Sequence, residues 1–360
     1  MRTTTLPVFT GLRGLAALIV LFFHLRTPVG IELTFGMADP FSMFGWMGVD
    51  MFFVLSGFIL SHVYSDQFSD TLSRADLRSF AVSRFSRIYP LHFVTTFLML
   101  LAYATAVSVG TAPTETGGYN PSSVILSLLL VQEWFGVTAP NPGSWSISIE
   151  LINYIVFPIV IFMTARLPKY WPVPAILFGA LIANLNVNTN ITHGVAEFIM
   201  GCAAYSAAKH VNIKVPLPLS GVFYVLPFLI AYSKGATGFG IPAICFAAAI
   251  FFLAVSGPYD PFARLCASRP LVFLGEISYS VYLLQWFVWI GWKHVIARLP
   301  VFSGHPYLMI SCAAASLIVV SIGSYYAFEK PARSLLRRRL DPFASQAPQS
   351  VAARANSASI

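Results

Sequence analysis

The chain has 360 residues, of which 57% are hydrophobic and only 10% are charged. Soluble domains carry about 25% charged residues and about 45–50% apolar ones. The mean hydropathy is +0.72, so the composition excludes an ordinary soluble domain and indicates a chain whose apolar surplus faces lipid.

The net charge of +8 does not point to nucleic acid, because the basic residues lie between apolar runs, where membrane topology places them. The sequence contains no P-loop, no HExxH and no nucleophile elbow. The four cysteines are scattered and have neither disulfide nor metal-ligand spacing. We therefore expect no nucleic-acid partner and no metal.

Apolar runs of about 17–25 residues predict membrane-spanning helices. Ten such runs lie near residues 8–28, 42–63, 90–110, 146–165, 172–187, 192–208, 217–232, 238–256, 270–295 and 306–328. An eleventh run, 121–137, is short and has Glu133 and Trp134 near its end. The first run has no convincing cleavage site, so we expect it to be a retained helix rather than a signal peptide.

The positions of the basic residues decide how the eleventh run is interpreted. If it does not cross and the N-terminus is cytoplasmic, most of the 22 Lys and Arg residues lie inside. If it crossed, the cluster Arg337–Arg339 would face outward. The positive-inside rule thus predicts an all-α polytopic membrane helix bundle of about ten spans plus a re-entrant or interfacial helix, with both termini cytoplasmic.

We expect two parts in the chain, a membrane domain over residues 1–335 and a cytoplasmic tail over residues 336–360. The tail is first basic and then rich in Ala, Ser, Gln and Pro, a composition typical of disorder. The longest hydrophilic stretch before it, at 64–89, is expected on the cytoplasmic side.

The first run carries Arg13 and His24 in GLRGLAALIVLFFH. They are eleven positions apart, which on a helix places them on nearly the same face and about 16 Å apart along the axis. A buried imidazole can act as a general base near neutral pH. The alternative is a packed histidine bonded to a neighbour, with Arg13 as an anchor at the cytoplasmic end.

The second run contains GWMGVDMFFVLSGF. Asp50 is a candidate acid or base, because an unpaired carboxylate in lipid is costly. Ser56 and Gly57 form a pair of small residues, for which close helix packing is the alternative to a functional role.

Two arginines, Arg84 and Arg87, precede the third run in FAVSRFSRIYPLHF. Their i, i+3 spacing puts both guanidinium groups on one helical face, which suits bidentate binding of phosphate. The alternative is simple anchoring at the membrane surface.

The segment NPGSWSISIE leads into the fourth run and carries Trp145, Ser146, Ser148 and Glu150. Ser146 and Glu150 share a helical face, whereas Ser148 points elsewhere. Glu150 is either a second buried acid or base, or the structural partner of a buried Arg or His. For the later segment LGEISYSVYLLQ, packing and interface anchoring are the favoured roles.

In their order and spacing, these segments resemble the bacterial acyltransferase-3 family of membrane O-acyltransferases, from about residue 8 to 335. The resemblance rests on Arg13 with His24, GVDMFFVLSGF, RFSRIYP, GSWSISIE, LGEISYSVYLL and FEKPAR. It implies an enzyme of the bacterial inner membrane that transfers an acyl group other than amino-acyl, often acetyl. The donor would be acyl-coenzyme A, such as acetyl-CoA, and the acceptor a hydroxyl of a saccharide, glycan precursor or similar molecule.

The resemblance also implies roles for individual residues. His24 would be the general base, with Glu150 or Asp50 orienting its imidazole and stabilising its charged form. Arg13, Arg84 and Arg87 would bind the coenzyme A phosphates. Ser56, Trp145 and Ser148 are expected to contact the substrate.

Two positions depart from the family pattern. Many relatives have Asp at Thr10 and His at Gln285, which bears on pH dependence and acceptor choice. We also expect a stand-alone membrane unit without the extracytoplasmic hydrolase-like domain of some relatives. Buried Asp, Glu and His also suit a proton-coupled transporter or flippase, which remains the alternative together with a catalytically silent sensor.

Overall fold

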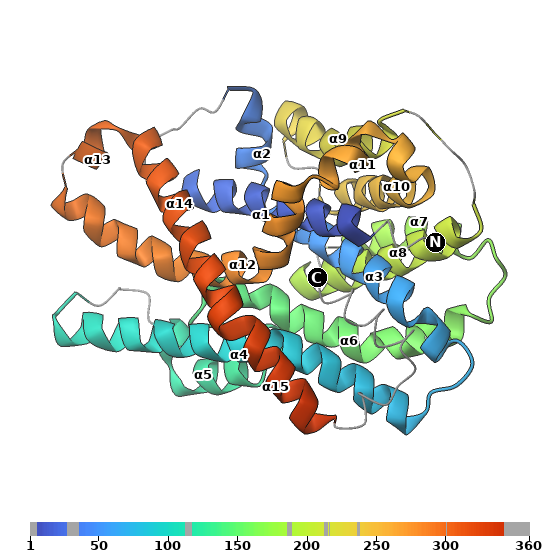
Figure 1. Ribbon diagram of the computed structural model, residues 1–360, viewed down its shortest axis with the longest axis horizontal. Coiled ribbons are helices and arrows are strands. Elements are labelled where there is room, and N and C mark those ends of the chain that lie inside the picture. The colour runs from blue at the N-terminus through green and yellow to red at the C-terminus, as the bar shows by residue number, and fades with distance from the viewer. Residues whose placement is uncertain are drawn as a thin grey trace.

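The computed structural model describes residues 6–26, 36–111, 117–185, 189–211, 215, 217–235, 238–299 and 301–341. Within these residues every regular element is a helix, and the helices pack around one another as a bundle (Figure 1). The prediction of an all-α polytopic membrane fold is confirmed.

Each of the ten predicted runs corresponds to a helix. These helices are α1 (Leu6–Arg26), α3 (Met47–Phe68), α4 (Arg74–Ser108), α6 (Trp145–Thr164), α7 (Pro172–Ala183), α8 (Thr189–Lys209), α9 (Leu219–Lys234), α10 (Gly240–Ser256), α12 (Arg269–Arg298) and α14 (Pro306–Ser324). Shorter elements join them, namely η3 (Gly36–Ala38), α2 (Asp39–Met43), η4 (Gly117–Tyr119), α5 (Pro121–Leu128), η5 (Gln132–Phe135), η6 (Pro142–Ser144), η7 (Gly257–Tyr259), α11 (Pro261–Cys266), α13 (Val301–Gly304), the π-helical η8 (Tyr325–Glu329) and α15 (Lys330–Leu340).

Seven helices in the described part of the chain are long and apolar enough to cross a membrane by length and composition. Helices α7 and α9 are apolar but shorter, and α8 has 21 residues but carries His193 and Glu197. The count of ten spans and the cytoplasmic termini therefore stay predictions.

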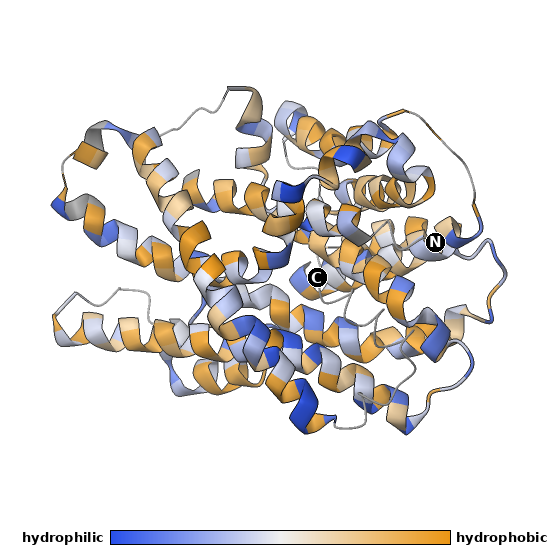
Figure 2. Ribbon diagram, in the orientation of Figure 1, coloured by the Kyte–Doolittle hydropathy of each residue, from blue (hydrophilic) through white to orange (hydrophobic). Residues whose placement is uncertain are grey.

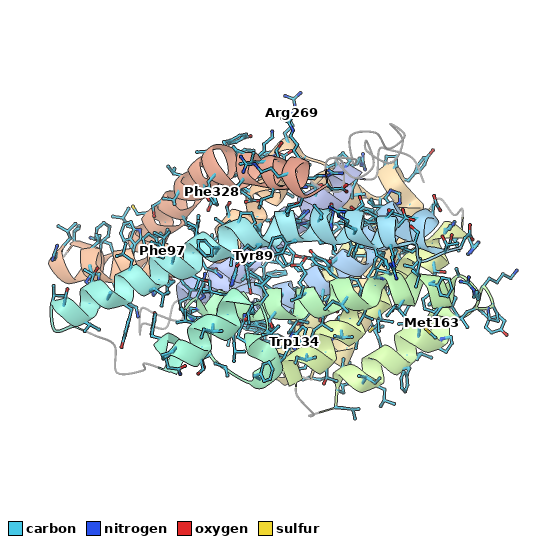
Figure 3. All side chains as sticks on the ribbon, turned by 90° about the horizontal axis from the view of Figure 1, so that it is seen from below. Tyr89, Phe97, Trp134, Met163, Arg269 and Phe328 are labelled. Atoms are coloured by element: carbon cyan, nitrogen blue, oxygen red, sulfur yellow. The ribbon has the colours of Figure 1, made fainter. Side chains whose placement is uncertain are left out.

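The outside of the bundle is apolar, as a lipid-facing surface requires. Phe97 and Met163 are 59% and 62% exposed on α4 and α6 (Figure 3). Apolar residues cover most helices, and hydrophilic residues gather at the end of α15 (Figure 2). This distribution matches a multi-pass membrane protein.

Helix α4 begins much earlier than the predicted third run. It runs unbroken for 35 residues, with Pro90 inside it, and begins where the Ser73 side chain accepts a hydrogen bond from the Asp76 amide. This serine cap lets a helix start among polar residues, so the predicted hydrophilic stretch 64–89 is mostly helical. At about 1.5 Å per residue, α4 exceeds the thickness of a bilayer's hydrocarbon core.

The eleventh run forms α5 and η5 rather than a spanning helix. Helix α5 has 8 residues, or about 12 Å, too short to cross the hydrocarbon core. The His92 ring on α4 donates to the Ser127 carbonyl at 2.8 Å, which ties α5 to α4. This geometry agrees with the prediction that the segment does not cross.

The predicted tail is helical at its start, because Arg337–Arg339 belong to α15. The α15 helix packs against α4 (Figure 1), where Arg78 donates to the Leu340 carbonyl at 3.1 Å. The expected disorder concerns residues that, beyond Asp341, lie outside the described part of the chain.

Two helix pairs cross at very short range because glycines face a neighbouring backbone. A Cβ on Gly57 of α3 would lie 2.0 Å from the Phe198 carbonyl oxygen of α8, and one on Gly201 would lie 1.9 Å from that of Val54. Likewise, a Cβ on Gly275 of α12 would lie 1.8 Å from the Thr10 oxygen of α1. Small residues allow this approach. At Gly57 the structure thus shows the close helix packing that was the alternative to a functional role.

Candidate functional site

A cavity lies between α1, α3, α4, α6 and α12, with about 860 Å³ of space including its mouth. Its polar lining consists of Arg13, Ser56, Arg84, Arg87, Ser146, Glu150, Tyr154, Ser278, Tyr279 and Tyr282. Val49, Phe52 and Phe53 are among its apolar residues.

Helix α4 supplies two of the cavity's three arginines. Arg84 is only 3% exposed, and its Nη2 donates to the Tyr64 hydroxyl and to Ser83 Oγ, both at 3.1 Å. The Tyr64 and Tyr154 rings lie 5.3 and 6.0 Å from its guanidinium carbon. Arg87, one turn later, is less buried and lines the same cavity.

The third arginine comes from α1. Arg13 Nη2 donates to Ser278 Oγ of α12 at 3.3 Å, a contact made possible by the close crossing at Gly275. The cavity lining thus combines three guanidinium groups with one carboxylate, that of Glu150. Such a lining favours an anionic ligand with several negative charges.

Glu150 and Ser146 both line the cavity, as their four-residue spacing predicts. The Tyr154 hydroxyl donates to Glu150 Oε1, and Ser146 Oγ shares a 2.9 Å hydrogen bond with the Tyr282 hydroxyl. Glu150 is therefore held by a tyrosine one turn along its own helix.

The expected substrate contacts separate in the structure. Ser56 lines the cavity, but Ser148 does not and instead accepts a hydrogen bond from the Glu133 amide at 3.3 Å. Trp145 packs against the Phe53 and His193 rings, with centroids 6.3 and 6.4 Å away. The cavity thus includes only Ser56 of these three residues, because Ser148 and Trp145 lie on other faces of α6.

His24 lies in a second, smaller cavity between α1, α12 and α14, with about 330 Å³ of space including its mouth. Its Nδ1 lies 2.9 Å from the Val20 carbonyl oxygen, which can only accept a hydrogen bond. The proton is therefore on Nδ1, and the lone pair is on Nε2. The Trp286 ring packs against the imidazole with centroids 5.2 Å apart.

The expectation that Glu150 or Asp50 orients His24 is not met in this structure. Tyr154 bonds Glu150 and His193 contacts Asp50, whereas a backbone carbonyl of α1 orients His24. The physical reason is that Asp50 faces α8 and Glu150 faces the arginine cavity, so neither carboxylate faces the second cavity.

The two residues that depart from the family pattern lie in different parts of the structure. Gln285 lines the second cavity beside His24. Thr10 lies fourteen positions before His24, about 21 Å along α1, and packs against Gly275. Gln285 can therefore influence His24 directly, and Thr10 cannot.

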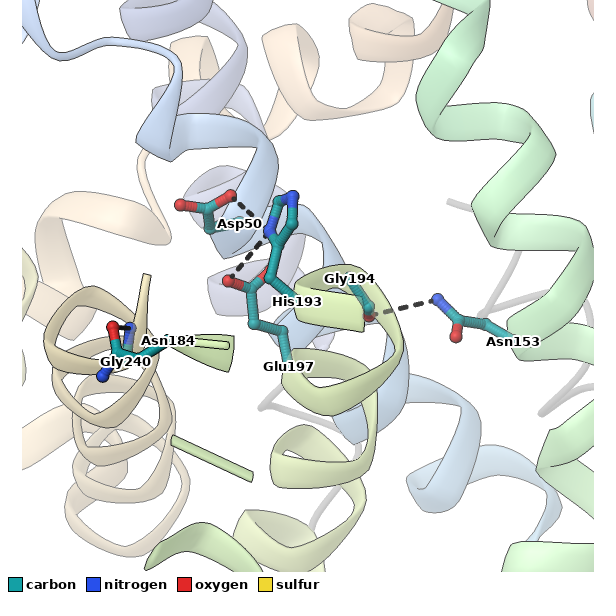
Figure 4. Close-up of polar contacts among 7 residues, drawn as sticks. All are labelled: Asp50, Asn153, Asn184, His193, Gly194, Glu197 and Gly240. Carbon is teal, nitrogen blue, oxygen red and sulfur yellow. Dashed lines mark hydrogen bonds and ion pairs between the residues drawn. The ribbon is translucent and has the colours of Figure 1, made fainter. Parts of the chain in front are cut away.

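The structure also brings Asp50 together with His193 and Glu197, two residues that sequence reasoning did not single out. His193 Nδ1 of α8 lies 3.6 Å from Asp50 Oδ1 and 3.5 Å from Glu197 Oε1 (Figure 4). Elsewhere, Glu329 accepts a 2.6 Å hydrogen bond from Ser280 Oγ. The available signal was the ionisable pair His193 and Glu197, four apart within an otherwise apolar run.

The fold and its cavities define an integral membrane protein with an internal, arginine-lined cavity. The sequence profile described as the acyltransferase domain matches residues 7–326, and the chain belongs to this family. The resemblance deduced from the motifs is thereby confirmed.

Individual relatives are bacterial proteins. The acyltransferase MdmB of Streptomyces mycarofaciens is 33% identical over 50% of this chain and 46% of its own length. The putative peptidoglycan O-acetyltransferase YrhL of Bacillus subtilis is 24% identical over 91% of this chain and 55% of its own. The peptidoglycan O-acetyltransferase OatA of Listeria monocytogenes is 24% identical over 77% of this chain and 48% of its own length.

The chain spans about half the length of the curated relatives it matches. No solved structure matches it significantly. With its apolar helices, this relationship makes the chain a multi-pass bacterial membrane protein of the acyltransferase family.

Proposed function

We propose that this protein transfers an acyl group, most simply acetyl, from acyl-coenzyme A to a hydroxyl of a saccharide or similar acceptor. The observation that carries the proposal is the gathering of Arg13, Arg84 and Arg87 in one cavity. Family membership supplies the reaction class, and relatives named peptidoglycan O-acetyltransferases suggest the acceptor class.

The negative charge of the proposed donor matches the positive charge of the arginines that line the cavity. Coenzyme A carries a diphosphate and a further phosphate, and guanidinium groups bind phosphate oxygens through paired charge-assisted hydrogen bonds. Arg84 is preorganised by Tyr64 and Ser83, so little side-chain entropy is lost when it binds an anion. The phosphates would therefore lie against α4 and the start of α1.

The thioester would then continue along α1 and α12 towards His24. Both helices line both cavities, and Tyr282 of the first lies one turn before Trp286 of the second. The rise from Arg13 to His24, about 16 Å, is comparable with an extended pantetheine arm.

In the proposed reaction, His24 Nε2 takes the proton of the acceptor hydroxyl as its oxygen attacks the thioester carbonyl carbon. The tetrahedral intermediate collapses, the carbon–sulfur bond breaks, and the thiolate of coenzyme A receives the proton from His24. The hydrogen bond from Nδ1 to Val20 fixes the tautomer that this step requires.

The decisive experiment compares His24→Ala with His210→Ala, which removes an exposed histidine. A strain without the gene is complemented with each variant, and the O-acyl esters of its envelope glycans are measured. In a second assay, each purified protein is incubated with acetyl-CoA and the release of free thiol is measured. We expect His24→Ala to lower the rate by about 10²–10⁴-fold and His210→Ala to leave it unchanged. Undiminished transfer by His24→Ala would exclude the general-base role, and absence of thioester consumption by the wild type would favour a transporter.

A further inference from the structure

The side chains of Asp50, His193 and Glu197, here called the α3–α8 cluster, form a group buried between two helices. Their exposed fractions are 1%, 2% and 0%. One nitrogen and two carboxylate oxygens of the three residues all lie within 4.8 Å of one another. Figure 4 shows the imidazole pointing at both carboxylates.

The cluster's polar atoms lack hydrogen-bond partners among the described residues. These atoms are Asp50 Oδ2, both ring nitrogens of His193 and both carboxylate oxygens of Glu197. Leaving a buried polar atom without a partner costs about 1–3 kcal/mol, and more for a charged group. Two carboxylates against one imidazole also leave buried negative charge that no neighbouring cation in the cluster balances.

The distances indicate what could satisfy these atoms. The two N···O separations of 3.5 and 3.6 Å exceed the usual hydrogen-bond range of about 2.7–3.2 Å. They match the edge of a coordination tetrahedron, which is about 3.3–3.6 Å for metal–ligand bonds of about 2.0–2.2 Å. A proton shared between the groups would instead draw one pair to hydrogen-bond distance.

The surroundings hold the imidazole in place. The His193 ring stacks on Phe239 with centroids 3.9 Å apart, and Phe53 and Trp145 pack on its other sides. The neighbouring Gly194 carbonyl accepts from Asn153 of α6 at 3.5 Å. The close crossings at Gly57 and Gly201 set α3 against α8, so His193 and Glu197, one turn apart, both meet Asp50.

We propose that the α3–α8 cluster binds one divalent transition-metal ion through Asp50, His193 and Glu197. Imidazole with carboxylates is a donor set for Zn²⁺ and Mn²⁺, and three protein ligands leave a position for a further ligand. The ion ties α3 to α8 beside Val49 and Phe53, which line the arginine cavity. It therefore rigidifies one wall of that cavity, whatever reaction takes place there.

The experiment uses the full chain without a histidine tag, purified in detergent. Metal content is measured by mass spectrometry, and after chelator treatment the binding of Zn²⁺ and Mn²⁺ is followed by titration and thermal unfolding. The variants are Glu197→Gln and His193→Gln. The control is His92→Gln, which alters another buried histidine that lies on α4, outside the cluster.

We expect one metal equivalent in the wild type and in His92→Gln, and an affinity at least about tenfold lower in both cluster variants. Metal-free Glu197→Gln should unfold at or above the wild-type temperature, because it loses a buried like charge. With metal added, the wild type should unfold at a higher temperature than Glu197→Gln. A carboxylate with a purely structural role would not produce this reversal.

Three results would overturn the proposal. The first is a wild type that contains no metal and shows no shift in unfolding with either ion. The second is metal binding by both cluster variants as tight as that of the wild type, which would place the ion elsewhere. The third is equal destabilisation of Glu197→Gln with and without metal.

Discussion

Two of the cavity's three arginines, Arg84 and Arg13, are each held by a particular hydrogen-bond partner. Arg84 donates to Tyr64 and Ser83, and Arg13 donates to Ser278 on a different helix. Guanidinium groups at membrane depth are costly unless they are paired. The gathering of three such groups at one cavity is therefore better explained by the proposed anionic ligand than by anchoring alone.

Arg87 offers the sharpest residue-scale test, because it lines the cavity and is less buried than Arg84. A charge-assisted hydrogen bond contributes about 1.5–3 kcal/mol, so Arg87→Ala should raise the KM for acetyl-CoA by about 10–100-fold. Arg87→Lys should show a smaller loss, since it keeps the charge but not the bidentate grip. Steady-state kinetics of thiol release measure both.

The control for this prediction is the donor itself. Acetyl-pantetheine carries the thioester without the phosphates, so its KM should be nearly the same for wild type and Arg87→Ala. An equal loss with both donors would show that Arg87 supports the fold rather than the phosphates.

At the scale of elements, the crossing of α1 and α12 positions the site. Gly275 allows α12 to approach the Thr10 backbone, and three residues later Ser278 receives the Arg13 guanidinium. The same two helices continue to His24 and Gln285. One close contact thus sets the register of both cavities.

Glycine substitutions in α12 test this register. Gly275→Ala would place a Cβ 1.8 Å from the Thr10 oxygen, and overpacking of this kind costs about 1–3 kcal/mol. We expect a lower unfolding temperature in detergent and reduced acyl transfer. Gly291→Ala in the same helix meets no atom within 4 Å and should be neutral or stabilising by up to about 1 kcal/mol. Equal behaviour of the two variants would contradict the close crossing.

At the scale of the whole molecule, orientation in the membrane decides which face the arginine cavity serves. By the positive-inside rule, the basic segments predict that the α3–α4 connection and α15 lie on the cytoplasmic side, where acyl-coenzyme A is made. The far end of α4 would then lie outside, and α4 would carry the chain from the donor side towards the opposite face.

Cysteine accessibility tests this orientation. Thr71 and Val109 lie at opposite ends of α4 and are exposed, whereas Cys202, Cys245 and Cys266 are buried. In a Cys312→Ala background, a membrane-impermeant thiol reagent applied to intact cells should label Val109→Cys and not Thr71→Cys. The reverse pattern would invert the predicted topology.

Much of the fold and part of the site followed from local pattern. Apolar length placed the ten helices, and four-residue spacing correctly put Ser146 and Glu150 on one face. The start of α4 was missed because a single capping serine outweighed the polar composition after it. Boundaries depend on such caps more than on hydropathy.

The sequence by itself determined the class of protein and its helices, because these depend on composition and helical periodicity. Only the tertiary structure decided which side chains meet: Asp50 faces His193 and Glu197 rather than His24, and Ser148 bonds the Glu133 amide rather than lining the cavity. Periodicity describes one helix at a time. Which neighbour a face meets depends on close crossings at a few glycines, and those are set by the packing of the whole bundle.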